Sequence, residues 1–161
     1  MSDANSLYLL GGALSSDERI ERFKTAVTKS WDHFLRLEDM DLVVLKGHLL
    51  VEEQLRVMVE DKLINPKEIQ RFSFSQYLSL TKAMYELPEN TPWLWTSITC
   101  LNRLRNTVAH ELEPGDLDRR IKELQNVVPR NDELAPEHSV RDCISSIYIC
   151  CMWFTVINNC G

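Results

Sequence analysis

An arginine, an asparagine and a histidine stand close together in Arg105-Asn106-Thr107-Val108-Ala109-His110, which we call the motif segment. Cleavage of an RNA phosphodiester without a metal needs a group that gains and loses protons near neutral pH, and histidine meets that need. It also needs a fixed cation to hold the phosphate as negative charge grows, and arginine provides one. Asn106 can orient His110 or hydrogen-bond the phosphate. The expected reaction is attack by the adjacent ribose 2′-hydroxyl, leaving a 2′,3′-cyclic phosphate and a 5′-hydroxyl, with no metal and no cofactor.

The motif segment falls near the end of a predicted helix, which Thr91 caps and which closes at Pro114. At about 100° per residue, one side of this helix gathers apolar residues that must face the core. They are Leu101, Leu104, Val108 and Leu112.

Three polar residues of this helix, Asn102, Asn106 and His110, follow one another at spacings of four and form what we call the polar ridge. This spacing lets Asn106 touch His110. Arg105 lies at the boundary between ridge and core, about 140° around the helix from His110. The two side chains therefore meet on one phosphate only through the length of Arg105, a bend or end of the helix, or a second copy of the chain.

Each of these residues also has an ordinary structural explanation. Arg105 can pair with a carboxylate of a neighbouring helix, and a protonated His110 near a helix C-terminus interacts favourably with the helix dipole. His48 and Glu52 form another pair, at i and i+4. That pair can support His110 from an adjacent helix or be an ordinary surface hydrogen bond, and we favour the surface interpretation.

The stretch Leu101–Leu112 resembles the motif of the HEPN family, an arginine, usually a polar residue such as asparagine, three variable residues and a histidine late in a helical bundle. The small Ala109 before the histidine and the earlier helical segment Gly47–Leu55 are also similar to that family. The resemblance covers about Trp31 to Leu112 in layout, and the motif is its specific part.

This resemblance implies a homodimer in which two motif helices face each other and form a composite ribonuclease cleft for an RNA substrate. Arg105, Asn106 and His110 would be the catalytic residues, with Asn102, His48 and Glu52 as supporting candidates. Many HEPN ribonucleases are toxins or phage-defence effectors paired with an antitoxin, commonly a small nucleotidyltransferase. Other members have lost catalysis and bind nucleotides or proteins, so a helical regulatory module, for example one related to the mannitol operon repressor, is the alternative.

Apolar residues recur at three and four along most of the chain, and no segment alternates as a strand would. The pattern predicts an all-α fold, a single bundle of about five to six helices built on two long antiparallel helices. Residues 1–15 are expected to be an N-terminal tail and residues 16–161 a single HEPN-like domain. Besides the motif helix, the predicted helices are 17–37, 41–63, 73–87, 117–127 and 140–158.

The formal net charge is −6 and the isoelectric point is about 5.2, which argues against a broad basic surface for nucleic acid. RNA contact would have to be local. A basic run is available, but acidic residues interrupt it, and we expect a solvated helix surface whose charges compensate one another. Its members are Arg103, Arg105, Arg119, Arg120 and Lys122.

Five cysteines make an odd number, and none has the spacing of a zinc site. Cys143 and Cys150 lie seven apart, two helical turns along one face, so packing as reduced thiols is the favoured interpretation.

The longest apolar-rich segment, Cys143–Ile157, is too short and too polar to span a membrane. Leu7–Leu10 is too short for the apolar part of a signal peptide. We therefore expect a cytoplasmic protein.

Overall fold

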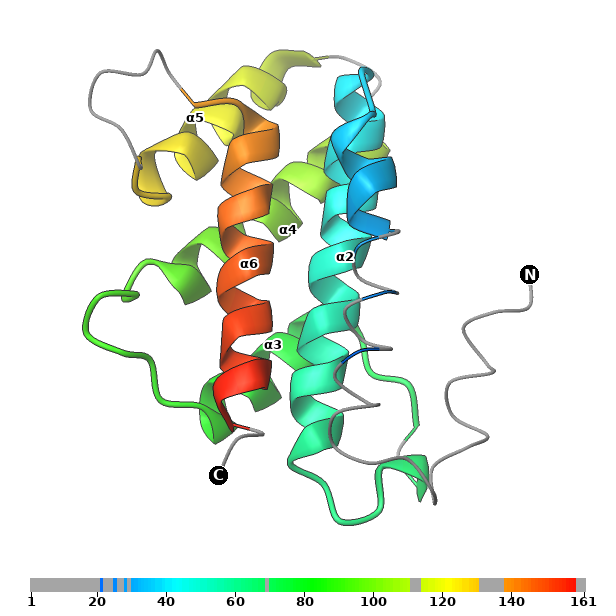
Figure 1. Cartoon of the computed structure of the whole chain (residues 1–161). Coiled ribbons are helices and arrows are strands. Elements are labelled where there is room, and N and C mark those ends of the chain that lie inside the picture. The colour runs from blue at the N-terminus through cyan, green and yellow to red at the C-terminus, as the bar shows by residue number, and fades with distance from the viewer. Residues whose placement is uncertain are drawn as a thin grey trace. The chain divides into compact units, whose positions relative to one another are not determined.

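The computed structural model describes residues 30–68, 70–110, 114–130 and 138–158, together with residues 21, 25 and 28. The chain divides into two compact units, Met1–Arg36 and Leu37–Gly161. Every regular element among the described residues is a helix (Figure 1). The predicted all-α fold is therefore confirmed.

In the first unit, residues 30–35 are helical and belong to the helix predicted for residues 17–37. Trp31 and Phe34 lie one turn apart on it, with ring centroids 5.6 Å from each other. The predicted tail of residues 1–15 lies outside the described residues. The antiparallel pairing of this helix with the next would join the two units, so it stays a prediction, as does the division into a tail and one domain.

The second unit begins with α2, which spans Met40–Asp61. Its first turn is capped by Asp39, whose Oδ1 accepts a hydrogen bond from the backbone N–H of Leu42 at 2.9 Å; this satisfies one of the N–H groups that a helix start leaves free. The helix buries a stripe at spacings of three and four, formed by Val44, His48, Val51, Leu55 and Met58.

After a short 3-10 turn, Pro66–Glu68, the chain enters α3, Phe74–Met84. A capping box starts this helix, since the hydroxyl of Ser73 accepts from the N–H of Gln76 at 3.4 Å and the side chain of Gln76 accepts from the N–H of Ser73 at 2.9 Å. Phe74 and Tyr77 then point into the core and are buried.

Helix α4 spans Leu94–His110, and it begins two residues later than the sequence predicts. Thr91 does not cap it, because its hydroxyl donates to the carbonyl of Pro88 at 3.2 Å, and the carbonyl of Thr91 accepts from the N–H of Leu94. The 3-10 turn Pro114–Asp116 leads into α5, Leu117–Val127, and the last helix is α6, Val140–Asn158. Both α-helices have the predicted bounds.

The two longest helices of this unit, α2 and α6, lie side by side and run in the same direction (Figure 1). Contacts at both ends establish the direction. Near the start of each helix, a guanidinium N–H of Arg141 donates to the carbonyl of Leu37. Near their ends, the amide of Gln54 donates to the hydroxyl of Thr155 at 2.6 Å. Helix α4 packs against both α2 and α6, and α5 packs against α4.

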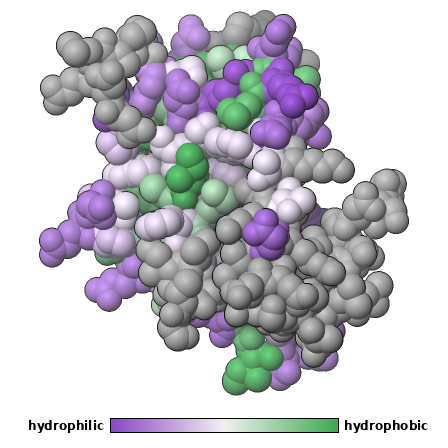
Figure 2. All heavy atoms as spheres, in the orientation of Figure 1, coloured by the Kyte–Doolittle hydropathy of each residue, from purple (hydrophilic) through white to green (hydrophobic). Residues whose placement is uncertain are grey.

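Some apolar side chains of this unit face solvent. Leu42 and Leu49, which contribute to the apolar pattern of α2, are 45% and 52% exposed. On α6, Ile149 and Trp153 are 51% and 63% exposed, and Figure 2 shows a small hydrophobic group over this helix, bordered by less hydrophobic atoms. Among the helices of the described residues, none has both the length and the apolar character needed to cross a membrane.

Candidate functional site

Helix α4 presents the motif segment along its last turns. Its core side is fully buried at Leu94, Ile98, Leu101 and Leu104. Val108, expected on the same side, is half-buried, and Leu112 lies outside the described residues. Of the polar ridge, Asn106 and His110 are exposed and Asn102 is half-buried.

The guanidinium of Arg105 is tied to its neighbour in sequence. Its Nη1 donates to Oδ1 of Asn106 at 3.2 Å. The ridge spacing lets Asn106 reach His110, yet within the described part of the chain the hydrogen bond of Asn106 is made with Arg105 instead. This bond accounts for one of the five N–H groups of a guanidinium, and the described residues accept no further hydrogen bond from Arg105.

His110 is the last residue of α4 and is exposed to solvent. Because the α-helix continues unbroken from Arg105 to His110, the ideal separation of about 140° around the axis applies to this pair. A cation in this last turn interacts favourably with the helix dipole. The chain thus offers one exposed imidazole and one half-buried guanidinium on different sides of the same helix end.

His48 is buried, which corrects the surface interpretation. Only 4% of the residue is exposed, and its ring stacks on Phe74, the first residue of α3, with centroids 4.2 Å apart. Its Nε2 lies 3.0 Å from Oδ1 of Asn102 on α4. The structure therefore brings together two of the supporting candidates, His48 and Asn102, from two different helices.

The bond to Asn102 sets the tautomer of His48. An amide oxygen can only accept, so Nε2 carries the proton and donates it. Nδ1 is then the unprotonated nitrogen, and among the described residues this buried atom has no hydrogen-bond partner. Burial lowers the pKa of His48 to about 4, the bond to Asn102 opposes this shift, and the positive charge of Arg105 adds to it. His48 is therefore neutral at physiological pH.

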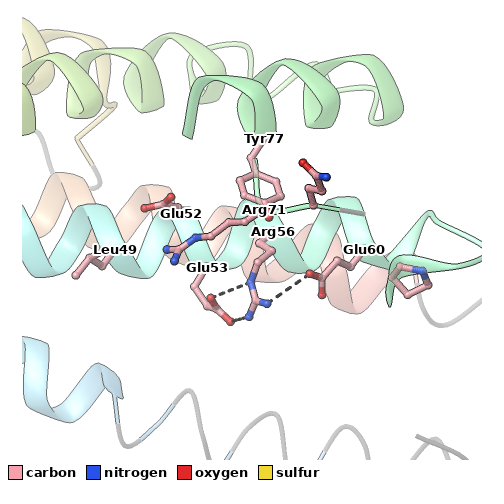
Figure 3. A pocket seen from close by; sticks show the side chains of 9 residues that line it. Leu49, Glu52, Glu53, Arg56, Glu60, Arg71 and Tyr77 are labelled. Atoms are coloured by element: carbon pink, nitrogen blue, oxygen red, sulfur yellow. Dashed lines mark hydrogen bonds and ion pairs between the residues drawn. The ribbon is translucent and has the colours of Figure 1, made fainter. Parts of the chain in front are cut away.

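Glu52, the third supporting candidate, is not bonded to His48 in the described residues. It lines a pocket of about 390 Å³ between α2 and the segment that leads into α3. Figure 3 shows Arg71 and Tyr77 entering this pocket from the side opposite α2, while Arg56 forms ion pairs with Glu53 and Glu60. The charge of Arg56 is thereby compensated, and no residue of the motif segment lines the pocket.

Two of the three basic residues of α5 are paired, as the interrupted charge pattern predicts, and Lys122 is exposed without an ion pair among the described residues. Arg119 forms ion pairs with Asp116 at 3.0 Å and with Glu123 at 3.3 Å, and Arg120 pairs with Glu123 at 2.8 Å. The hydrogen bond and charge of Arg119 lower the pKa of Asp116, and those of Arg120 lower the pKa of Glu123. These charges compensate one another, so α5 adds little free positive charge next to the motif helix.

The described cysteines are free thiols within the helical core. Cys100, Cys143 and Cys151 are buried, which supports the packing interpretation; Cys150 is half-buried, and Cys160 lies outside the described residues. Burial raises the pKa of the Cys143 thiol to about 12. Within the described residues, no group of three or more histidine, cysteine or acidic side chains is placed to hold a metal ion.

Sequence reasoning did not pair His48 with Asn102 and did not include Phe74 in the site. A signal for the burial of His48 was available, because Val44, His48, Val51 and Leu55 share one helical stripe. Nothing in the sequence indicates the stacking on Phe74, which depends on how α3 packs against α2. No protein-family model, no curated protein and no solved structure matches the chain.

Proposed function

We propose that this chain is a metal-independent endoribonuclease of the HEPN type, and that it acts as a homodimer in which two α4 helices border one cleft. The observation that supports this most is the exposed end of α4, where His110 faces solvent and Arg105 is oriented by Asn106. A helix end that carries a proton-transfer group and a cationic group outside the core suits chemistry on a strand bound between two copies of that helix.

In this proposal the 2′-oxygen of the ribose forms a new bond to phosphorus while the bond from phosphorus to the 5′-oxygen breaks. A neutral His110 accepts the proton of the 2′-hydroxyl, and the imidazolium formed gives this proton to the departing 5′-oxygen. Arg105 holds the charge that builds on the phosphate oxygens. A second copy places its His110 opposite Arg105 of the first and so overcomes the angular separation of the two residues on one helix.

The test is cleavage of RNA by the purified full chain in the presence of a chelator, with detection of the 2′,3′-cyclic phosphate product. We expect His110→Ala and Arg105→Ala to lower the rate by about a hundredfold or more, the range for loss of a proton-transfer group or a charge-stabilising donor. Arg103→Ala is the matched control, because it removes an exposed arginine from the same helix. Equal rates for parent and His110→Ala, or loss of cleavage with the chelator, would overturn the mechanism.

Mixing two inactive variants tests the shared cleft. If each site takes Arg105 from one copy and His110 from the other, a heterodimer of Arg105→Ala and His110→Ala contains one site with both residues intact. Mixed subunits should then recover a measurable part of the parent rate, whereas each variant alone stays inactive. No recovery after verified subunit exchange would show that the two residues do not act across the dimer.

A non-catalytic regulatory or binding module, for example one related to the mannitol operon repressor, is the second candidate. The pairing of Arg119 and Arg120 with acidic residues favours it, because little free positive charge is then left beside α4 for RNA. This candidate predicts no RNA turnover and a nucleotide or protein bound at the same face of α4.

The biological setting that we propose follows from the same resemblance. A cytoplasmic toxin or phage-defence effector would be controlled by an antitoxin, for instance a small nucleotidyltransferase, that covers the exposed end of α4. The free thiols of Cys100, Cys143 and Cys151 suit a reducing compartment. Co-purification of the parent with a neighbouring gene product, and inhibition of cleavage by that product, would test this setting.

A further inference from the structure

Two asparagines beside Arg105 have their carbonyl oxygens occupied by donors of the protein itself. Oδ1 of Asn102 accepts from Nε2 of His48 at 3.0 Å, and Oδ1 of Asn106 accepts from Nη1 of Arg105 at 3.2 Å. The oxygen and the NH₂ group of a primary amide lie on opposite sides of the same carbon. Each of these bonds therefore fixes the direction in which the NH₂ group points, away from its internal donor.

The three side chains share one stretch of the α4 surface. Asn102 lies three residues before Arg105 and four before Asn106, the spacings at which helical side chains are neighbours. With both amide oxygens engaged, this surface offers N–H groups from two amides and one guanidinium. A ligand rich in acceptors and negative charge, such as a phosphodiester, suits a surface in which N–H donors predominate.

His48 is placed to hold Asn102 rather than to touch a ligand. It is 4% exposed, its ring is stacked on Phe74, and it reaches Asn102 from a different helix. A ring packed in this way cannot turn freely, so the direction of its Nε2–H bond is fixed. Burial and the nearby Arg105 lower the pKa of His48 to about 4, so the ring keeps the neutral, donating form at neutral pH.

We propose that Asn102 is a phosphate-binding residue for a nucleic-acid strand, and that buried His48 is the positioning residue that turns the amide of Asn102 outward. Asn102 lies four residues further from His110 than Asn106 does, about 6 Å along the helix axis. Its NH₂ group therefore meets a phosphate next to the one that is cleaved. This inference rests on the proposed ribonuclease function for the identity of the strand.

The experiment measures binding apart from cleavage. A fluorescent 2′-O-methyl oligoribonucleotide, which lacks the attacking hydroxyl, is titrated with the full chain at low salt and followed by anisotropy. We expect Asn102→Asp to weaken binding about tenfold or more, because it replaces a donor with a negative charge while His48 keeps an acceptor. Asn126→Asp makes the same change of charge at an exposed position of α5 and should change the dissociation constant by less than twofold.

A double-mutant cycle separates positioning from direct contact. His48→Leu should weaken binding about threefold to tenfold. His48→Gln, whose side chain can still donate a hydrogen bond to Asn102, should bind more tightly than His48→Leu. In an Asn102→Ala background, His48→Leu should have no further effect, because the residue through which it acts is gone. Thermal unfolding of every variant verifies that it is folded at the assay temperature.

The salt dependence of binding gives an independent outcome. Arg105→Ala should lower the slope of the logarithm of affinity against the logarithm of salt by about one, and Asn102→Ala should leave it unchanged, since an amide carries no charge. Equal affinity of parent and Asn102→Asp overturns the binding site, and a full effect of His48→Leu in the Asn102→Ala background overturns the positioning role. Variant-sensitive binding without RNA cleavage supports this inference and contradicts the ribonuclease, whereas no binding by the parent contradicts both.

Discussion

Nε2 of His48 on α2 donates a hydrogen bond to Oδ1 of Asn102 on α4 over 3.0 Å. This bond links a buried imidazole to the start of a ridge whose other end, at His110, faces solvent. The polar ridge is therefore anchored in the core at one end. A charge placed on His48 would have to be accommodated in that core, beside the guanidinium of Arg105.

The burial of His48 makes stability depend on pH. Its pKa is about 4 in the folded protein and about 6.5 when exposed, so between these values the unfolded chain binds more protons. The stabilising contribution of neutral His48 is fully present above pH 6.5 and is lost as the pH decreases toward 4. When the pH is lowered from 7.5 to 5.0, we expect protonation of this residue to reduce the free energy of unfolding by about 2 kcal/mol. Urea unfolding of the parent and of His48→Gln measures it, because acidic groups common to both proteins cancel. The same pH dependence in both would contradict a buried, neutral imidazole.

The hydrogen bond between Gln54 and Thr155 should stabilise the contact of α2 with α6. Thr155→Val keeps the shape of the side chain but leaves the buried amide of Gln54 without its acceptor, which costs about 1–3 kcal/mol. Thr99→Val is the control, because among the described residues the hydroxyl of Thr99 bonds to the carbonyl of Trp95 in its own helix and to no other helix. Chemical denaturation should show a larger loss for Thr155→Val. Equal losses would mean that the bond between the helices adds nothing.

The capping box of α3 predicts the effect of a surface substitution. Ser73→Ala removes the hydroxyl that accepts from the N–H of Gln76, and loss of such a cap costs about 1 kcal/mol. Ser75→Ala, at an exposed position in the first turn of the same helix, should change stability much less. The midpoints of urea unfolding compare the two. A loss for Ser75→Ala as large as for Ser73→Ala would argue against this cap.

The buried thiols should resist alkylation in the folded protein. A pKa near 12 leaves Cys143 with roughly a thousandfold less thiolate than a thiol whose pKa is 9.0. Iodoacetamide labelling at pH 8, read by peptide mapping, should leave Cys100, Cys143 and Cys151 unmodified, while labelling in denaturant modifies all three. Rapid modification of Cys143 in the folded state would show that this side of α6 is in contact with solvent and would contradict its burial.

Much of the fold could be predicted from the sequence because most helix ends carry local signals. The bounds of α5 and α6 agree with the apolar spacing, and those of α2 differ from the prediction by one or two residues. The predicted start of α4 was wrong because Thr91 and Pro92 have the residue types of a cap and a first turn. Thr91 uses its hydroxyl in the preceding turn instead. Local chemistry allowed both arrangements, and packing decided between them.

The candidate site could be predicted only in part. Periodicity placed Asn102, Asn106 and His110 on one polar ridge; Asn106 and His110 are exposed, whereas Asn102 is half-buried and bonds to His48 on α2. The stripe that contains His48 was one signal for the buried face of α2, but it competed with apolar residues on other sides of that helix, such as the exposed Leu49. The partner of a buried polar group depends on contacts between helices that are distant in sequence, and one helix pattern does not contain them.

The shared direction of α2 and α6 has a consequence for folding during synthesis. Parallel neighbours need a connection that returns along the bundle, and here it contains α3, α4 and α5. When α2 leaves the ribosome, the side of α2 that carries Gln54 has to wait for its partner α6, which is made after all the other described helices. Contacts so distant in sequence slow folding and leave apolar surface exposed to aggregation in the meantime. We expect the nascent chain to recruit chaperones until α6 has emerged.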